Sequence, residues 1–244
     1  MSGHSHAKTI LHKKAITDAK RSKIFSKLSQ LISVAAREKG GEPETNAKLR
    51  LAIDQAKAAN MPSDNIERAV KKGAGELGNE KLEEVLFEAY GPGGLAIIIE
   101  GITDNKNRAL SEIKQILLQH NGKLAGSGSV QWLFERKGCI TISSDEQALE
   151  NKSKESLELT AIESGAQDIY WHNDNLDIYT KQEELEEVKK NLEEKGVKIN
   201  SASLDWAAKE EVSLPEKDKE SCQKLFEALD ENDSVQGIYS NLKL

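Results

Sequence analysis

The sequence predicts an α+β fold, in which an N-terminal three-helix domain precedes two α+β, ferredoxin-like domains, the third inserted in the second. Three observations support this prediction. The chain has 244 residues, more than a single compact core usually holds. After a Gly-rich stretch at 73–78, the composition changes from Lys and Ala to β-branched and aromatic residues. Beyond that stretch, strand-like runs alternate with helical patterns.

Three helical patterns fill the first part of the chain. Apolar residues recur at helical spacing over 24–35, and the Gly-Gly-Glu-Pro stretch at 40–43 ends the pattern. A second helix is predicted over 46–59. For a short third helix, Asp64 is the expected N-cap and Gly73 the expected stop. These helices predict a small bundle, preceded by an irregular arm.

The next elements form a hairpin, a helix and a strand. Residues 84–90 alternate between apolar and polar, GPGG at 91–94 is a turn, and 95–102 is a short apolar run. A helix over 107–120 and a strand over 129–134 follow.

A second series of elements has the order strand-helix-strand-strand-helix-strand, which is the ferredoxin-like plan. Its predicted elements lie at 139–143, 157–164, 168–171, 176–180, 183–194 and 197–204. The closing elements are a strand near 206–212, a helix at 217–228 and a strand at 234–239. They form no domain of their own, so we expect them to pack with the hairpin, helix and strand of residues 80–135. The predicted domains are 1–75, 80–135 with 206–244, and the inserted 136–205.

Charge is distributed unevenly along the chain. Residues 1–75 hold 15 basic and 7 acidic side chains, a net charge of +8, whereas the remainder holds 19 basic and 34 acidic, a net charge of -15. A basic end attracts polyanions and an acidic body repels them. A solubilising tail is the simpler alternative, but a basic cluster on one domain favours contact with nucleic acid or the ribosome.

Six basic residues are the primary candidates for nucleic-acid binding. They fall within about half a helical circumference if this segment is helical on its target, at 3.6 residues per turn: Lys13, Lys14, Lys20, Arg21, Lys23 and Lys27. Phe25 is the one aromatic residue among the first 75, so this segment has no base-stacking platform. We therefore expect contacts to phosphates, with little direct reading of bases.

A secondary candidate patch lies between an apolar strand and a helix, at Asn105, Asn107 and Arg108. Short polar side chains at a helix start are caps in the first instance. Arg108 differs, because a cation in the first turn opposes the helix dipole and is expected to pair with a carboxylate or an external phosphate.

The sequence offers little for catalysis, and we expect no enzyme, cofactor or metal site. No Gly-rich stretch fits a phosphate-binding fingerprint, and Cys139 and Cys222 are expected to be buried, reduced thiols. A pocket that holds Asp104, Arg108 and His120 together would revive an enzyme hypothesis. No apolar run approaches the roughly 20 residues that cross a bilayer, and no signal peptide is evident, so a cytoplasmic protein is expected.

Specific motifs occur along nearly the whole chain: GHS at 3–5, HKK at 12–14, DAKR at 18–21, ANMP at 59–62, YGPGG at 90–94, TDNKNR at 103–108 and GSGSVQWLFE at 126–135. In these motifs the chain resembles the YebC/PmpR family of probable transcriptional and translational regulatory proteins, which is related to the mitochondrial translational activator of cytochrome c oxidase. The chain departs from the family pattern at His6-Ala7 and at Ser22.

The resemblance implies a non-enzymatic regulator with a helical N-terminal domain and two α+β domains. Two functions stay open. The protein is either a ribosome-associated translation factor that contacts rRNA or tRNA and relieves stalling at proline-rich stretches, or a transcriptional regulator that binds duplex DNA. Neither predicted helix 46–59 nor the helix after it offers base-reading side chains at recognition-helix spacing, which favours RNA and the ribosome. We expect a monomer or a weak homo-oligomer.

Overall fold

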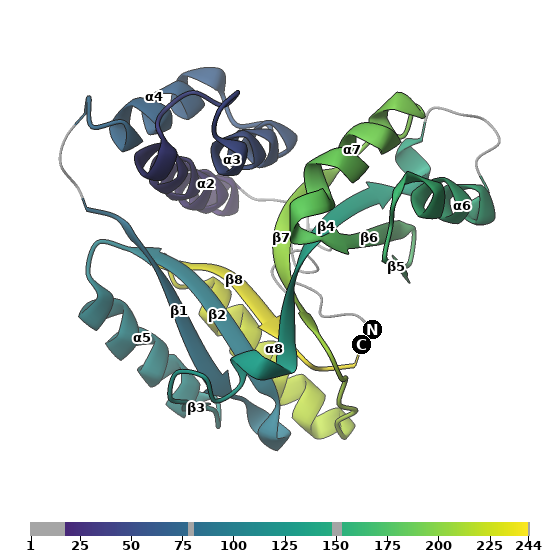
Figure 1. Ribbon diagram of the computed structural model, residues 1–244. Helices are drawn as coiled ribbons and strands as arrows, with labels where there is room; N and C mark the ends of the chain where they lie inside the picture. Colours follow the sequence, from purple (N-terminus) through teal and green to yellow (C-terminus); the bar gives the residue numbers. More distant parts are fainter. Residues whose placement is uncertain (1–17, 78–80, 148–152, 244) are drawn as a thin grey trace.

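The computed structural model describes residues 18–77, 81–147 and 153–243. Within these ranges, a helical domain lies beside two four-stranded antiparallel sheets, each with helices on one face (Figure 1). The predicted α+β class, with one α+β domain inserted in the other, is confirmed. The fold places the beginning of the first helix next to the last helix of the chain.

The helical domain consists of α2 (Asp18–Lys39), α3 (Ala47–Ala58) and α4 (Ser63–Gly73). Asn46 is buried and joins two of them: its side-chain oxygen accepts the backbone N–H of Leu49 at 3.0 Å, and its amide donates to the carbonyls of Ala35 and Gly40. This Asn caps α3 and satisfies two carbonyls at the end of α2.

The predicted cap of the third helix is wrong. The helix α4 begins at Ser63, with Pro62 at the N-cap position and no side-chain cap, so Asp64 lies inside the first turn. Proline has no N–H and has a fixed φ, which suits a helix start. The carboxylate of Asp64 still favours this end of the helix through the dipole.

The first sheet has the order β3-β1-β2-β8. Its strands are β1 (Glu83–Tyr90), β2 (Ala96–Thr103), β3 (Lys123–Leu124) and β8 (Val235–Ser240). The helices α5 (Lys106–Gln119) and α8 (Glu216–Asp230) cover one face. Alternate β2 side chains face the two sides: Ile97 and Ile99 pack under these helices, whereas Ile98 belongs to a smaller cluster on the opposite face. The predicted return of the chain end to this unit is confirmed, because β8 pairs with β2.

The second sheet has the order β5-β6-β4-β7. Its strands are β4 (Phe134–Ser143), β5 (Asp168–His172), β6 (Asn175–Lys181) and β7 (Ser201–Ala208). The helices α6 (Lys154–Ser164) and α7 (Leu185–Glu194) pack on one face around a separate core. Leu51 of α3 packs against this core, so the helical domain is anchored on the inserted domain.

One predicted strand in this region is wrong, and two others are a single strand. Residues 129–134 form a loop and a short 3-10 turn (η2, Gln131–Leu133) because the buried carboxylate of Glu88 takes the backbone N–H groups that a strand would pair. The predicted strands 197–204 and 206–212 are one strand, β7, which pairs with β4 from Phe134↔Ala208 to Thr141↔Ser201.

The paired strands β4 and β7 form a long ribbon that runs from the first sheet into the second (Figure 1). The domain division that the sequence suggests, at 135/136 and 205/206, falls inside this ribbon and stays a proposal. Since continuous strands link the two α+β domains, the ribbon restricts how they move relative to each other.

Candidate nucleic-acid interface

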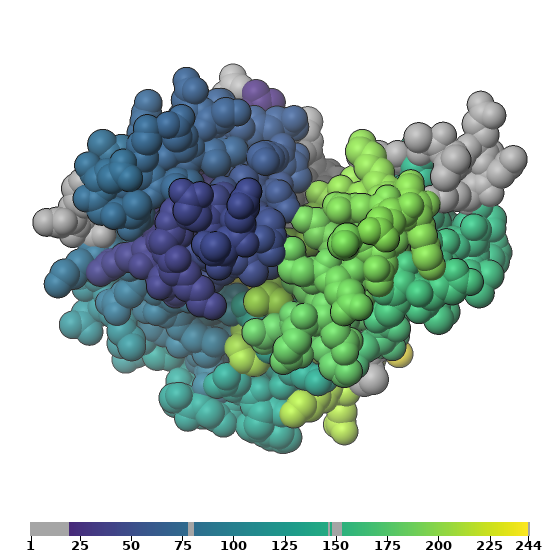
Figure 2. All heavy atoms as spheres, turned by 45° about the horizontal axis from the view of Figure 1, so that its top comes forward, coloured from purple at the N-terminus to yellow at the C-terminus, as the bar shows by residue number. Residues whose placement is uncertain are grey.

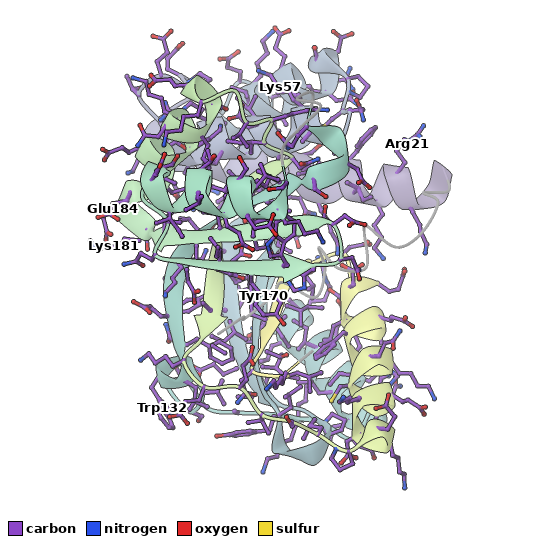
Figure 3. The ribbon with its side chains drawn as sticks, turned by 90° about the vertical axis from the view of Figure 1, so that its right-hand side faces the viewer. Arg21, Lys57, Trp132, Tyr170, Lys181 and Glu184 are labelled. Carbon is purple, nitrogen blue, oxygen red and sulfur yellow. The ribbon has the colours of Figure 1, made fainter. Side chains whose placement is uncertain are left out.

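The first described turns of α2 present two cations to solvent. Lys20 and Arg21 are both exposed, and Figure 3 shows Arg21 pointing outward from the end of the helix. Lys13 and Lys14 lie outside the described residues. Two of the six predicted phosphate contacts are therefore accessible in the structure, on the same helix end.

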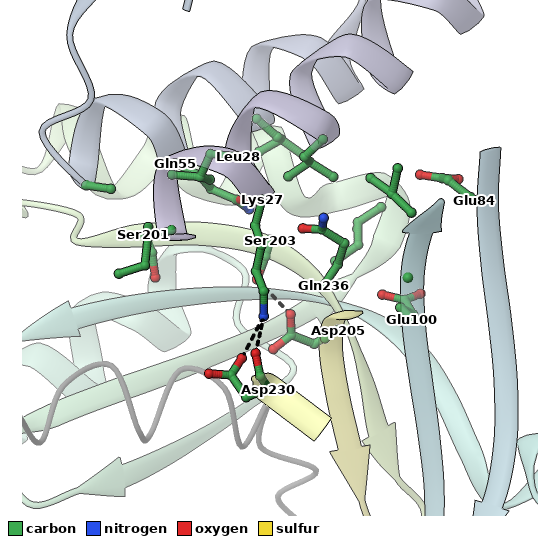
Figure 4. A pocket seen from close by; sticks show the side chains of 18 of the residues that line it. Lys27, Leu28, Gln55, Glu84, Glu100, Ser201, Ser203, Asp205, Asp230 and Gln236 are labelled. Carbon is green, nitrogen blue, oxygen red and sulfur yellow. Dashed lines mark hydrogen bonds and ion pairs between the residues drawn. The ribbon is translucent and has the colours of Figure 1, made fainter. Parts of the chain in front are cut away.

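The next two candidate cations are paired within the molecule. Lys23 Nζ lies 2.8 Å from Glu231 Oε2 and also donates to the Glu231 carbonyl. Lys27 Nζ lies 2.9 Å from Asp230 Oδ1 and donates to the Asp230 carbonyl at 2.8 Å (Figure 4). Their side chains are only 24% and 14% exposed. The binding role of Lys23 and Lys27 stays a proposal, and it requires these pairs to open.

The carboxylate of Glu231 responds to this cationic surface. The hydrogen bond from Lys23 lowers the pKa of Glu231 below its ordinary value, against the opposing effect of burial, and the charges of Lys23, Lys20 and Lys27 lower it further. Glu231 therefore stays ionised to a lower pH than an ordinary glutamate, and it is electrostatically complementary to α2.

A cleft of about 1890 Å³ lies between the helical domain and the two sheets. Its walls come from α2, α3, β1, β2, β7 and α8, and Figure 2 shows the helical domain and the inserted domain side by side on this side of the molecule. Among the described residues that line it, nine are acidic and eight are Lys or Arg. The eight cations include Lys20 and Arg21, so the rest of the lining holds nine acids against six cations, and a polyanion is attracted to the end of the cleft that α2 forms.

Two of the three cations of α3 are used inside the molecule, whereas Lys57 in its last turn is exposed. Lys48 lies 2.7 Å from Glu84 and 2.9 Å from Glu38, and Arg50 lies 3.1 Å from Glu186 of α7. Burial opposes the charge of Lys48, but its hydrogen bonds to the two glutamates raise the net pKa. These contacts hold α3 against the α+β domains.

A polar cluster lies in the wall of the cleft around Glu100. One carboxylate oxygen accepts from Arg136 at 2.7 Å and from Trp206 Nε1 at 2.9 Å, and the other accepts from Tyr239 Oη at 3.3 Å. The Arg136 guanidinium also lies 5.1 Å from the centroid of the Trp206 ring. Burial, and then the charge of Glu100, raises the pKa of Tyr239 well above its ordinary value. This cluster joins β2, β4, β7 and β8 and has a structural role.

The secondary patch is organised as a helix cap. Asn105 caps α5 by accepting the N–H of Arg108 at 3.1 Å, and Arg108 donates to Asp104 at 2.5 Å. The expectation that Arg108 pairs with a carboxylate is confirmed. All three candidates, Asn105, Asn107 and Arg108, are exposed, and a binding role for them stays a proposal.

The arrangement that would revive an enzyme hypothesis does not form at the cleft. His120 lines the cleft, whereas Asp104 and Arg108 are not among its lining residues. Within the described residues, no group of three or more His, Cys, Asp or Glu side chains is placed to hold a metal ion. Cys139 and Cys222 are buried and form no disulfide with each other, as expected, and burial raises the pKa of Cys222 to about 11.

Comparison with protein families identifies the chain along most of its length. A family model described as the TACO1/YebC protein N-terminal domain matches residues 5–76. A second one, described as the TACO1/YebC second and third domain, matches residues 82–242. The chain belongs to the TACO1/YebC family. This membership confirms the YebC/PmpR resemblance that the motifs indicated.

Relatives in this family are similar over their full length. Probable transcriptional regulatory proteins of Thermoanaerobacter pseudethanolicus and Thermosipho melanesiensis are 46% and 47% identical over 244 residues, covering all of this chain and 98% and 94% of theirs. A crystal structure of a conserved hypothetical protein from Aquifex aeolicus matches with a TM-score of 0.89 and 48% identity, over 96% of this chain and 95% of that one. These comparisons support a regulatory protein in general terms.

Two features of this TACO1/YebC member were not found by sequence reasoning. One is the acidic group at the end of α8, Asp230, Glu231 and Asp233, which meets the basic face of α2. Its acidic run is visible in the sequence, but pairing across some 200 positions is not. The other is Trp132, which lies in a segment predicted as a strand and is 64% exposed. Within the described ranges, no helix is long and apolar enough to cross a membrane.

Proposed function

We propose that this protein is a non-enzymatic, nucleic-acid-binding regulator of gene expression that acts in the cytoplasm on translating ribosomes, as a monomer or weak homo-oligomer, and relieves stalling at proline-rich stretches. The phosphates of rRNA or tRNA are its proposed targets. The resemblance to translation-acting members of the family supports the part concerning proline-rich stretches.

The observation that carries the RNA-binding part is the contrast between α2 and α3. The end of α2 exposes Lys20 and Arg21, which suits contact to a phosphate backbone without base reading. The helix α3 is held by ion pairs and by a hydrogen bond from Gln55 to the Ala202 carbonyl at 2.8 Å. A promoter-specific regulator needs a helix or ribbon that is free to enter a groove, and α3 is not free.

Transcriptional regulation is the second candidate, because curated relatives are named probable transcriptional regulatory proteins. In that case the same end of α2 would contact the backbone of duplex DNA, and sequence would be read by another element. Duplex DNA should displace the protein from ribosomes if the second candidate holds, but not if the first one does, and this difference can be measured.

The test is co-sedimentation with translating ribosomes through a salt series, with random duplex DNA as competitor. The Lys20→Ala/Arg21→Ala variant is compared with Lys190→Ala/Lys195→Ala, which removes two cations from the inserted domain; the Lys190 side chain is 74% exposed. We expect binding to survive excess DNA and the first variant to flatten the log-log salt slope by about 1.4 to 1.8 units, at about 0.7 to 0.9 per contact.

Two results would contradict the proposal. Release of the protein by duplex DNA would favour the transcriptional candidate, and the search would turn to promoter sequences. Equal binding by the wild type and the Lys20/Arg21 variant would show that this end of α2 makes no phosphate contacts. The Lys190/Lys195 control is expected to bind like the wild type.

A further inference from the structure

Trp132 is the most exposed large hydrophobic side chain among the described residues, at 64%. It lies in η2, at the outer surface, and Figure 3 shows it on the opposite side of the molecule from Arg21. A single exposed apolar residue is ordinary on a protein surface. Leu118 of α5 is 63% exposed and needs no explanation. Two further features distinguish Trp132 from it.

The first feature is the rigid loop that presents the ring. Trp132 Nε1 donates to the Ser129 carbonyl at 3.0 Å, which fixes the orientation of the indole. The loop is held from below by Glu88, whose carboxylate accepts the N–H groups of Gly128, Val130 and Gln131 at 2.5, 2.6 and 2.9 Å. Pre-organisation of this kind reduces the entropy that binding would otherwise cost.

The second feature is a pair of exposed cations, one bonded to the loop backbone and one beside the neighbouring Tyr90 ring. Lys209 is exposed, and its Nζ donates to the Trp132 carbonyl at 2.8 Å, which leaves two of its three N–H groups free for a ligand. Lys123 is exposed as well, and its Nζ lies 5.4 Å from the centroid of the Tyr90 ring. The Tyr90 hydroxyl donates to the same Ser129 carbonyl at 3.3 Å, so both aromatic rings converge on one point.

The carboxylate of Glu88 in β1, under this loop, does not repel an anion at the surface. Glu88 is 3% exposed and its two oxygens are directed at backbone N–H groups. The loop therefore presents an aromatic ring, with the ammonium group of Lys209 bonded to its backbone and that of Lys123 beside the neighbouring Tyr90 ring. Base–aromatic stacking combined with backbone contact to cations is how proteins bind single-stranded nucleic acids.

We propose that Trp132 is a stacking platform for an unpaired nucleobase, in an RNA strand whose phosphates lie against Lys123 and Lys209. This inference rests on the proposed function and deepens it, because it adds a second RNA contact to the phosphate contacts of α2. The exposed end of α2 has no stacking residue of this kind, whereas Trp132 supplies one at the other side of the molecule.

The test is equilibrium binding of the full chain to a labelled short oligoadenylate, single-stranded or paired with oligouridylate, over a salt series. The variants are Trp132→Ala, Trp132→Phe and the control Leu118→Ala, which removes an equally exposed apolar side chain. Thermal unfolding is measured for each of them. We expect Trp132→Ala to weaken single-strand binding about tenfold, within the range for loss of one stacked base, and to leave duplex binding unchanged.

The salt dependence separates stacking from charge. The salt slope is expected to stay the same in Trp132→Ala, because a lost stack releases no counterions, and Trp132→Phe should recover most of the affinity. Wild-type affinity of Trp132→Ala for the single strand, or an equal loss on the duplex, would overturn the inference. If Lys20→Ala/Arg21→Ala flattens the slope while Trp132→Ala changes nothing, the proposed function stands and this inference falls. If neither changes binding, both fall.

Discussion

At the scale of single residues, Glu88 shows how one side chain decides a local structure. It occupies an alternating strand, where the sequence pattern is typical of a solvent-facing acid, yet it is buried and accepts three backbone N–H groups. Burial raises its pKa, but the hydrogen bonds from Val130, Gly128 and Gln131 outweigh burial and leave the pKa below the ordinary value. A sequence pattern does not reveal this role, since the partners are some 40 positions away.

The first prediction concerns stability and pH. Glu88→Gln replaces one acceptor oxygen with a donor that faces backbone N–H groups, so we expect a loss of about 2 kcal/mol in unfolding free energy near neutral pH. Because the folded pKa is lowered, the contribution of Glu88 is complete above its ordinary value of about 4.3 and is lost as the pH falls through the folded pKa.

Denaturant unfolding of the wild type and Glu88→Gln over a pH series measures this effect. The difference between them should shrink below about pH 4, and Glu210→Gln, at an exposed position, should behave like the wild type. A difference that is constant across the pH range would show that the charge of Glu88 is not what holds the loop.

At the scale of elements, the hairpin and the helices were predictable from periodicity, because each has a local pattern of apolar residues, and the return of the last strand was predictable because the closing elements form no unit of their own. The ribbon of β4 and β7 was not. Its strands carry the chain from one core to the other: Phe134 and Ala208 pack on the first sheet, and Ile140 and Ala202 pack in the inserted domain. These residues share one face of the ribbon, because each pair is an even number of positions apart in an uninterrupted register. A local alternation therefore does not reveal that one strand serves two cores.

The junction of α2 and α8 gives the second prediction. Lys27 and Asp230 form a partly buried ion pair that joins elements at opposite ends of the chain. A double-mutant cycle of Lys27→Ala and Asp230→Ala should give a coupling of about 1 kcal/mol, at the upper end of the range for exposed pairs. The coupling is expected to decrease in high salt.

The matched control is the pair Lys190 and Glu194 on α7, whose side chains are 74% and 64% exposed. A cycle there should give a coupling near zero, as for many surface pairs. Equal coupling energies for the two pairs would mean that the ion pair between α2 and α8 stabilises the docking of the helical domain no more than an exposed surface pair would.

At the scale of the whole molecule, the charge count predicted a basic end and an acidic body but not their contact. The structure folds the acidic end of α8 against the basic face of α2, so Lys23 and Lys27 are paired while Lys20 and Arg21 are exposed. The candidate site could therefore be predicted by residue type and segment, whereas which cations are accessible depends on contacts between residues some 200 positions apart. The family was predictable from motifs, and the fold class from the alternation of strand-like runs with helical patterns.

The most direct test of the central claim is a reconstituted translation reaction that contains a message with a proline-rich stretch and a matched message without it. We expect the protein to increase the full-length product of the first message only, and the Lys20→Ala/Arg21→Ala variant to lose this effect while Lys190→Ala/Lys195→Ala retains it. An unchanged yield of the proline-rich product in the presence of ribosome-bound wild-type protein would contradict the account.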